Sequence, residues 1–177
     1  YHSTTGVATK IVDGNHTASV NVAPTGNTSF GTVDLEDFSD TVAKLPLYAR
    51  RNAAWYISPA GYGSAMLRLA RASGGNTRAD VAGGFELRFL GFPVRLVHSM
   101  ESALTSTEDS VLCLFGDLSQ AATFGERRAV SIRTASERYI EFDQTLTFAT
   151  TRNAMVVHDL GSTSKAGPIV ALQAAAS

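Results

Sequence analysis

Apolar and polar residues alternate with a period of two in the second half of the chain. The alternation covers segments 130–133 and 140–148, whose apolar members are Val130, Ile132, Ile140, Phe142, Leu146 and Phe148. Successive side chains of a β-strand point to opposite faces, so this pattern is typical of strands with one covered face. Residues 155–157 add a last apolar strand. The pattern therefore predicts an extended platform of long strands that lies against a partner.

A shorter apolar run precedes these strands and is followed by a helix signal. Residues 111–115 form the run, and Gly116 stops it. Asp117 is a good helix N-cap, and Gly125 suits the left-handed position that often ends a helix. We therefore expect a strand at 111–115 and a short helix at 118–124.

Two helices are predicted in the first half of the chain. The first covers residues 34–45, with Asp34 as its N-cap. The second is capped by Ser58, has Pro59 at its first helical position, and ends at the glycines 74–75. Their inward faces are expected to carry Leu35, Phe38, Val42, Leu45, Tyr62, Met66 and Leu69.

The remaining segments alternate between short strands and polar connections. The expected strands cover residues 8–12, 18–22, 52–57, 85–90, 94–97 and 169–172. The expected loops cover residues 76–84, 99–110 and 161–167, and the alanine-rich tail is expected to fray. This mixture of helices and strands indicates the α+β class.

The composition of the 177-residue chain narrows the function classes. A hydrophobic content of 44% is ordinary for one domain or two small subdomains, and a net charge of -1 gives no bulk attraction to nucleic acid. Twelve Arg outnumber three Lys, which suits interfacial ion pairs because the planar guanidinium binds carboxylates in a bidentate way; a GC-rich genome would give the same excess. No apolar run approaches the ~20 residues that span a bilayer. The chain opens with Tyr1 rather than Met, which indicates a fragment or a processed product.

Candidate catalytic and metal-binding residues form no recognisable site. The histidines are His2, His16, His98 and His158, and the adjacent pair His158–Asp159 is the nearest approach to a ligand set. Neighbouring strand residues point to opposite faces, so this pair is a poor joint metal ligand. Cys113 lies in an apolar run and is expected to be a core residue. We predict no catalytic, cofactor-binding or metal-binding residues.

Several short motifs occur in the order found in one viral family. They are AAWYISP at 53–59, LRLA at 67–70 with GG at 74–75, FLGFPV at 89–94, LFGD at 114–117, and the closing strands within 142–157. On these motifs, the chain resembles the C-terminal part of the major capsid protein of tailed bacteriophages, the Hong Kong ninety-seven type capsid fold. The similarity covers roughly residues 33–172. The resemblance implies that this fragment lacks the N-terminal arm, extended loop and spine helix of family members.

The resemblance also implies a division into two domains. Residues 7–115 with 168–177 would form the axial domain, which gathers around fivefold and sixfold axes. Residues 116–160 would form a portion of the peripheral domain. The loops 76–84 and 99–110 are expected at exposed or axis-facing edges, because they are polar.

The function that the resemblance implies is structural. The chain would be a virion protein of a bacteriophage, a major capsid subunit that self-assembles into hexamers and pentamers of an icosahedral shell. It would have no enzyme activity and no cofactor. Its partners would be other capsid subunits in a homo-oligomer, with a scaffold, a maturation protease or decoration proteins as further candidates. Packaged DNA would be contacted non-specifically, no membrane partner is expected, and assembly would occur in the bacterial cytoplasm.

Other function classes stay open at this point. A nanocompartment or gene-transfer-particle shell protein would share the fold, and a tail or head-completion component would form a ring of fixed copy number. A small α+β enzyme or binding module would instead show a deep pocket with convergent polar groups. On the predicted strands, Arg133, Glu137 and Arg138 would supply charge pairs between subunits or act as ordinary solvated charges.

Overall fold

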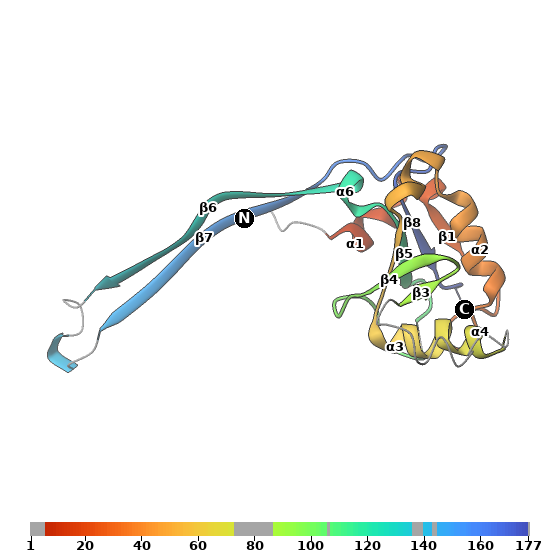
Figure 1. Ribbon diagram of the computed structural model, residues 1–177, viewed down its shortest axis with the longest axis horizontal. Coiled ribbons are helices and arrows are strands. Elements are labelled where there is room, and N and C mark those ends of the chain that lie inside the picture. The colour runs from red at the N-terminus through yellow and green to blue at the C-terminus, as the bar shows by residue number, and fades with distance from the viewer. Residues whose placement is uncertain (1–5, 73–86, 106, 136–139, 143–144, 177) are drawn as a thin grey trace.

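One long β-ribbon projects from a body that is built on a mixed sheet (Figure 1). The computed structural model describes residues 6–72, 87–105, 107–135, 140–142 and 145–176. The ribbon, called the arm below, consists of β6 (Ala122–Ala135) and β7 (Leu146–Val157). The chain therefore leaves the body, runs out and back along the arm, and returns to complete the sheet of the body.

The sheet of the body joins segments from both ends of the chain. Its strands, in spatial order, are β1 (Val20–Val22), β8 (Ile169–Gln173), β5 (Val111–Gly116), β2 (Ala54–Ile57), β4 (Phe92–Leu96) and β3 (Arg88–Phe89). β1 is parallel to β8 and β2 to β4, whereas β5 is antiparallel to both β2 and β8. The predicted strands at 111–115 and 169–172 are confirmed, the one at 52–57 is correct for residues 54–57, and the α+β class is confirmed.

Side chains of the central strands alternate between two apolar cores, one on each face of the sheet. Cys113 and Phe115 of β5 enter the larger core, whereas Leu114 between them enters the smaller one. β8 divides its side chains in the same way. A strand covered on both faces has a continuous apolar sequence, which explains why this part of the chain reads as uninterrupted apolar runs.

Aromatic rings fill the larger core beneath the helix α2 (Leu35–Lys44). Phe38 of α2 meets Trp55 and Phe89 edge to face, with ring centroids 5.5 and 5.1 Å away. The indole Nε1–H of Trp55 donates to the carbonyl oxygen of Phe89 at 3.1 Å. The fully buried tryptophan therefore has its polar atom satisfied, as buried indoles require. The predicted helix and its N-cap, Asp34, are confirmed.

The second helical segment begins where the sequence predicts it. The Oγ of Ser58 accepts a hydrogen bond from the N–H of Gly61 at 3.1 Å. The segment continues as α3 (Pro59–Gly61), one π-helical stretch, η3 (Tyr62–Met66), and α4 (Leu67–Ala72). The π-helical stretch was not predicted, because residue periodicity does not reveal single π turns. The expected end at the glycines 74–75 lies outside the described residues.

The smaller core connects the body to the root of the arm. The helix α1 (Val7–Ile11) buries Val7 and Ile11 in this core. Ala121 and Leu160, which flank the two ends of the arm, enter the same core. Two further short 3-10 segments, η1 (Thr17–Ser19) and η2 (Leu47–Asn52), complete the connections of the body.

The predicted strand at 8–12 is wrong, because this segment is helical. Val7 and Ile11 are four residues apart, so a helix places both on one buried face. The predicted strand at 18–22 is correct only for residues 20–22, since η1 precedes β1.

The predicted helix at 118–124 is too long, and Gly125 does not end it. The helix α6 covers only Leu118–Ala121, and β6 begins at Ala122. Phe124 pairs with Met155 and Gly125 with Ala154 across the arm. Pairing with a distant strand has replaced the last turn of a short, marginal helix.

The predicted strand at 140–148 is wrong in its first part, because Ile140–Phe142 form a 3-10 turn, η4. The predicted strand at 94–97 is confirmed over residues 94–96, which belong to β4. Within the described part of the predicted strand at 85–90, β3 covers Arg88–Phe89. The loop at 99–110 is confirmed where it is described, whereas the loop at 76–84 and the charged residues Glu137, Arg138 and Asp143 lie outside the described residues.

The alanine-rich tail is ordered, contrary to expectation. The N–H groups of Ala174 and Ala175 donate to the carbonyl oxygens of Ser110 and Asn27, both at 3.0 Å. The two alanines are only 0% and 3% exposed. Their small side chains let the chain continue from β8 along the larger core, so burial outweighs the fraying expected of a chain end.

Candidate functional site

The strand register gives the arm two chemically different faces. Residues directly opposite each other in an antiparallel pair share a face. The apolar face contains the pairs Ala122–Val157, Phe124–Met155 and Ile132–Ala149. The arginine face contains the pair Arg133–Phe148 together with Arg152 and Val156 of β7. Irregular pairing between Glu126 and Ser131 separates the inner and outer halves of the arm.

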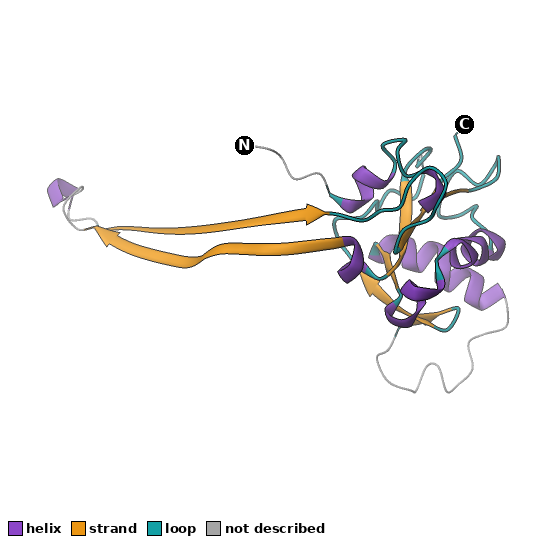
Figure 2. Ribbon diagram, turned by 90° about the horizontal axis from the view of Figure 1, so that it is seen from above, coloured by secondary structure: helices purple, strands orange, loops and turns teal. Residues whose placement is uncertain are grey.

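Large apolar side chains of the arm are open to solvent. Phe124 is 65% exposed, Ile132 66% and Val130 64%. Phe148 and Val156 on the arginine face are also exposed. Both ribbon views show the arm projecting away from the body, with no other described element beside its outer half (Figure 2). An isolated two-stranded ribbon is marginally stable in water, so this surface needs a covering segment or a covering partner.

Positive charge on the arm is not neutralised within the described part of the chain. Arg127, Arg133 and Arg152 have no ion pair or hydrogen bond to another described residue. Arg127 and Arg152 line a shallow hollow at the irregular pairing, beside Glu126. Guanidinium groups at such positions are suited to bidentate contacts with carboxylates or phosphates of a partner.

The outgoing connection of the arm is fixed by Gly116 and Asp117. Gly116 has φ +142°, and a Cβ at this position would collide with the carbonyl oxygen of Pro168. The carboxylate of Asp117 accepts hydrogen bonds from Ser119 N–H at 3.0 Å and Gln120 Nε2 at 2.9 Å. Burial raises the pKa of Asp117, but these hydrogen bonds outweigh it and hold the pKa below its ordinary value. The cap therefore starts α6 at the root of the arm.

The returning connection of the arm is held by the N-terminal part of the chain. The buried hydroxyl of Ser19 donates to the carbonyl oxygen of Leu160 at 2.6 Å and accepts from Gly167 N–H at 2.8 Å. The Nδ1 of His16 lies 2.8 Å from the carbonyl oxygen of Gly161. Residues 161–167, predicted as a flexible link, form a closed loop whose base is the bridge between Gly161 and Ala166.

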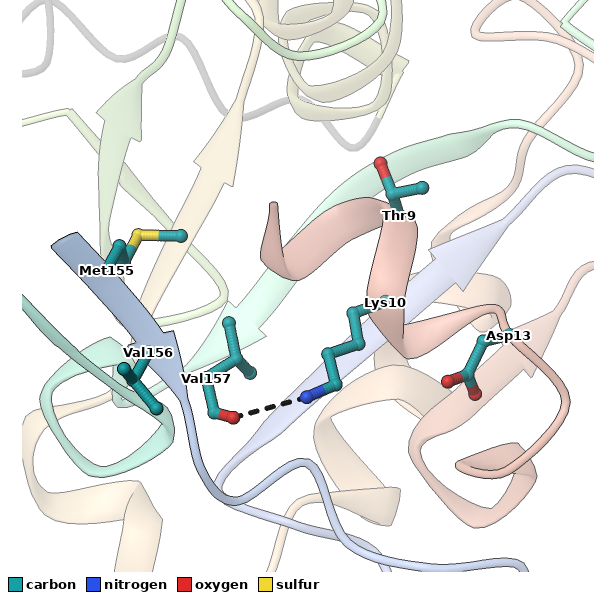
Figure 3. A pocket seen from close by; sticks show the side chains of 6 residues that line it. All are labelled: Thr9, Lys10, Asp13, Met155, Val156 and Val157. Carbon is teal, nitrogen blue, oxygen red and sulfur yellow. Dashed lines mark hydrogen bonds between the residues drawn. The ribbon is translucent and has the colours of Figure 1, made fainter. Parts of the chain in front are cut away.

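A shallow pocket lies where α1 meets the inner end of β7. Figure 3 shows the side chain of Lys10 reaching from α1 towards β7, where Nζ donates to the carbonyl oxygen of Val157 at 3.3 Å. The lining residues are Thr9, Lys10, Asp13, Met155, Val156 and Val157. The pocket has one cation and one carboxylate at its edge and no convergent set of polar groups, which an enzyme site would need.

The side chains best suited to catalysis or metal binding, the described histidines and Cys113, do not form a cluster. His98 and His158 are exposed at separate places, and His16 approaches Asp13 only to 3.9 Å. Burial raises the pKa of the Cys113 thiol, which keeps it protonated and unreactive in the core. The described residues contain no group of three or more potential metal ligands. Among the described helices, none has the length and apolar character needed to cross a membrane.

Sequence reasoning identified the arm as a surface but missed what holds it. The alternation of residues 130–133 predicted strands with one covered face, whereas the contacts of His16 and Ser19 with residues 160–167 join segments about 140 residues apart. Contacts at such separation leave no local pattern, because single polar residues in a loop are compatible with many partners.

Solved capsid structures share this fold at low sequence identity. The capsid of a native GTA particle matches with a TM-score of 0.66 and 20% identity, covering 89% of this chain and 54% of that chain. The capsid of an empty GTA particle gives 0.60 and 20%, covering 89% and 50%. The capsid of the cyanophage P-SCSP1u gives 0.52 and 16%, covering 90% and 54%. This chain therefore spans about half the length of the solved capsid chains that it matches.

The family comparison agrees with the fold. The model of the phage capsid family matches residues 3–161, which include both strands of the arm and most of the body. No curated protein sequence matches the chain significantly. The predicted capsid-type α+β fold is confirmed by these likenesses. The match over most of its length shows that this chain belongs to the phage capsid family.

Proposed function

We propose that the chain is a structural subunit of a capsid-type shell, and that the arm is its contact with neighbouring copies. The single observation that carries this proposal is the exposed apolar face of the arm, on a ribbon with two open edges. Surface of this kind in a folded protein marks an interaction site. Repeated use of one surface by identical copies produces closed symmetric assemblies.

The two-part shape supports the division into an axial and a peripheral region. The body contains the sheet and both cores, so residues 7–115 with 168–177 are proposed to form the axial domain. Residues 116–160, which include α6 and the arm, are proposed to form part of the peripheral domain. The low exposure of the body core and the high exposure of the arm fit a stable unit that carries a contact element.

Two kinds of particle are candidates for this shell, and they differ in the DNA that they enclose. A virion capsid around phage DNA is the leading proposal, supported by the family match. A gene-transfer-particle shell is the second candidate, supported by the likeness to two GTA capsids. Identification of the nucleic acid in purified particles separates the two, because phage-genome DNA is expected in a virion and fragments of host DNA in a gene-transfer particle.

Non-specific contact with nucleic acid is proposed for the arginine face. Arg133 and Arg152 carry charge that no described residue neutralises, and phosphate groups accept from guanidinium in a bidentate way. The net charge of -1 makes such contact weak for a single subunit. A catalytic role is not proposed, because the described surface offers no pocket with convergent acid–base or nucleophilic groups.

Assembly of the complete gene product tests the proposed function. Ile132→Glu places a charge on the apolar face of the arm, and Leu47→Glu makes the same kind of change on the body at a position 83% exposed. We expect light scattering and electron microscopy to show rings or shells for the unaltered protein and for Leu47→Glu, and only small species for Ile132→Glu. A protein that stays monomeric at high concentration without any substitution would overturn the proposal.

A further inference from the structure

A segment near the N-terminus forms hydrogen bonds with the returning end of the arm. We call residues 10–19 the clamp. Lys10 Nζ donates to the carbonyl oxygen of Val157, and His16 Nδ1 contacts that of Gly161. The backbone N–H of Ala18 donates to the carbonyl oxygen of Ser162 at 3.3 Å. Polar contacts from the clamp thus cover the stretch from the last residue of β7 to the loop beyond it.

Ser19 is the central contact of the clamp. Its hydroxyl is completely buried and bonds both sides of the loop, donating to Leu160 and accepting from Gly167. Gly161 has φ +81°, and a Cβ there would collide with the backbone of Gly167 and lie 2.8 Å from Ser19 Oγ. The packing at Gly161 is therefore too close to admit a side chain.

The other connections at the root act on the outgoing side of the arm or between its two strands, not on its returning end. On the outgoing side, α6 is a single helical turn. The N–H groups of His158 and Asp159 both donate to the carbonyl oxygen of Ala121, at 3.0 and 3.3 Å, so they tie the two arm strands to each other. These bonds keep the strands together, whereas the clamp bonds tie the returning strand to the body.

We propose that the clamp fixes the direction of the arm relative to the body, with Ser19 and His16 as its positioning residues. The clamp belongs to the body, since Ile11 within it and Val20 directly after it lie in the smaller core, and β1 follows directly in the sheet. Release of the clamp leaves the body sheet and the strand pairing of the arm intact but lets the arm swing about its root. The effect of the clamp on the arm does not depend on the proposed function. Its consequence does: in a shell subunit, the direction of the arm sets the angle between neighbouring subunits.

Single-molecule fluorescence energy transfer on the unassembled 177-residue chain tests this proposal. Dyes are attached through Ser39→Cys on α2 and Thr147→Cys on β7, both exposed positions. Cys113 is completely buried and does not compete for the dyes. The measurement is made at picomolar concentration, so a failure of shell assembly does not affect it.

Two clamp variants and one control decide the outcome. Ser19→Ala removes the buried hydroxyl, and His16→Ala removes a contact that lies nearer to solvent. Ser64→Ala is the matched control, because Ser64 Oγ donates to Ala60 O at 2.8 Å on a helix outside the clamp. We expect a broader distribution of transfer efficiency for both clamp variants and an unchanged one for the control.

Trp55 fluorescence in the same samples checks that the body remains folded. If Ser19→Ala unfolds the body, the distribution of transfer efficiency for His16→Ala alone tests the proposal. A narrow distribution identical to that of the unaltered chain in the folded clamp variants would overturn the proposal, because the arm would then be fixed without the clamp.

Discussion

Replacement of Phe38 and of Phe124 by alanine removes the same atoms from a covered and an uncovered position. Phe38 is 1% exposed and meets Trp55 and Phe89 edge to face in the larger core. Its removal leaves a cavity, and we expect Phe38→Ala to lower the free energy of unfolding by about 3–5 kcal/mol. Phe124 is 65% exposed on the arm, so Phe124→Ala is expected to change the free energy of unfolding by no more than about 0.5 kcal/mol.

The order of the two effects reverses when assembly is measured. Full burial of a phenylalanine side chain contributes about 1.5–3 kcal/mol. If the remaining exposed surface of Phe124 is covered by a neighbour, its loss weakens each contact by about 1.4 kcal/mol, or tenfold. Phe124→Ala is therefore expected to raise the concentration needed for assembly of the complete gene product about tenfold.

Two assays on matched samples separate these effects. Urea unfolding of the unassembled chain is followed through Trp55, the single tryptophan, which reports on the larger core. Light scattering against protein concentration gives the assembly threshold. Equal destabilisation of the unassembled chain by both substitutions would refute the reasoning, because Phe124 would then have to be covered within its own chain.

Three further predictions use the charges and the thiol. Asp117 has a lowered folded-state pKa, so its contribution to stability is full above the ordinary carboxyl pKa and is lost as the pH falls through the folded value. Asp117→Asn is therefore expected to flatten the acid side of the stability–pH profile measured by urea unfolding. An unchanged profile would contradict the role of the Asp117 carboxylate as the N-cap of α6. Cys113 is expected to resist alkylation in the folded chain and to react fully in denaturant, as measured by intact mass, and rapid labelling of folded protein would show that the core opens. If the arginine face binds duplex DNA, Arg133→Gln and Arg152→Gln are each expected to reduce the slope of log affinity against log salt by about 1, whereas a slope unaffected by either change would exclude that face.

The sequence was most informative where local signals and tertiary packing agree. The capping residues Asp34 and Ser58 begin helices in the structure, and the apolar run at 111–115 is a central strand. These signals depend on neighbouring residues along the chain, so they can be read without knowledge of the fold.

The errors of prediction occur where a distant segment competes with a local signal. Residues 122–125 follow a capped helix start but pair with β7 instead. The tail has the composition of a frayed end, yet Ser110 and Asn27 supply partners for its backbone. The short apolar pattern at 8–12 predicts a strand but fits a helix equally well, and only burial against the smaller core selects the helix at 7–11.

By itself, the sequence determined the class of the fold, the family resemblance and the presence of long amphipathic strands, because cap residues, periodicity and motif order are local properties. The tertiary structure decided three other features. It separated the arm from the body, it sorted the residues of the arm into an apolar and an arginine face through the strand register, and it placed Ser19 against Leu160. These features arise from contacts between segments far apart in the chain, whose energies depend on register and burial rather than on any neighbouring residue.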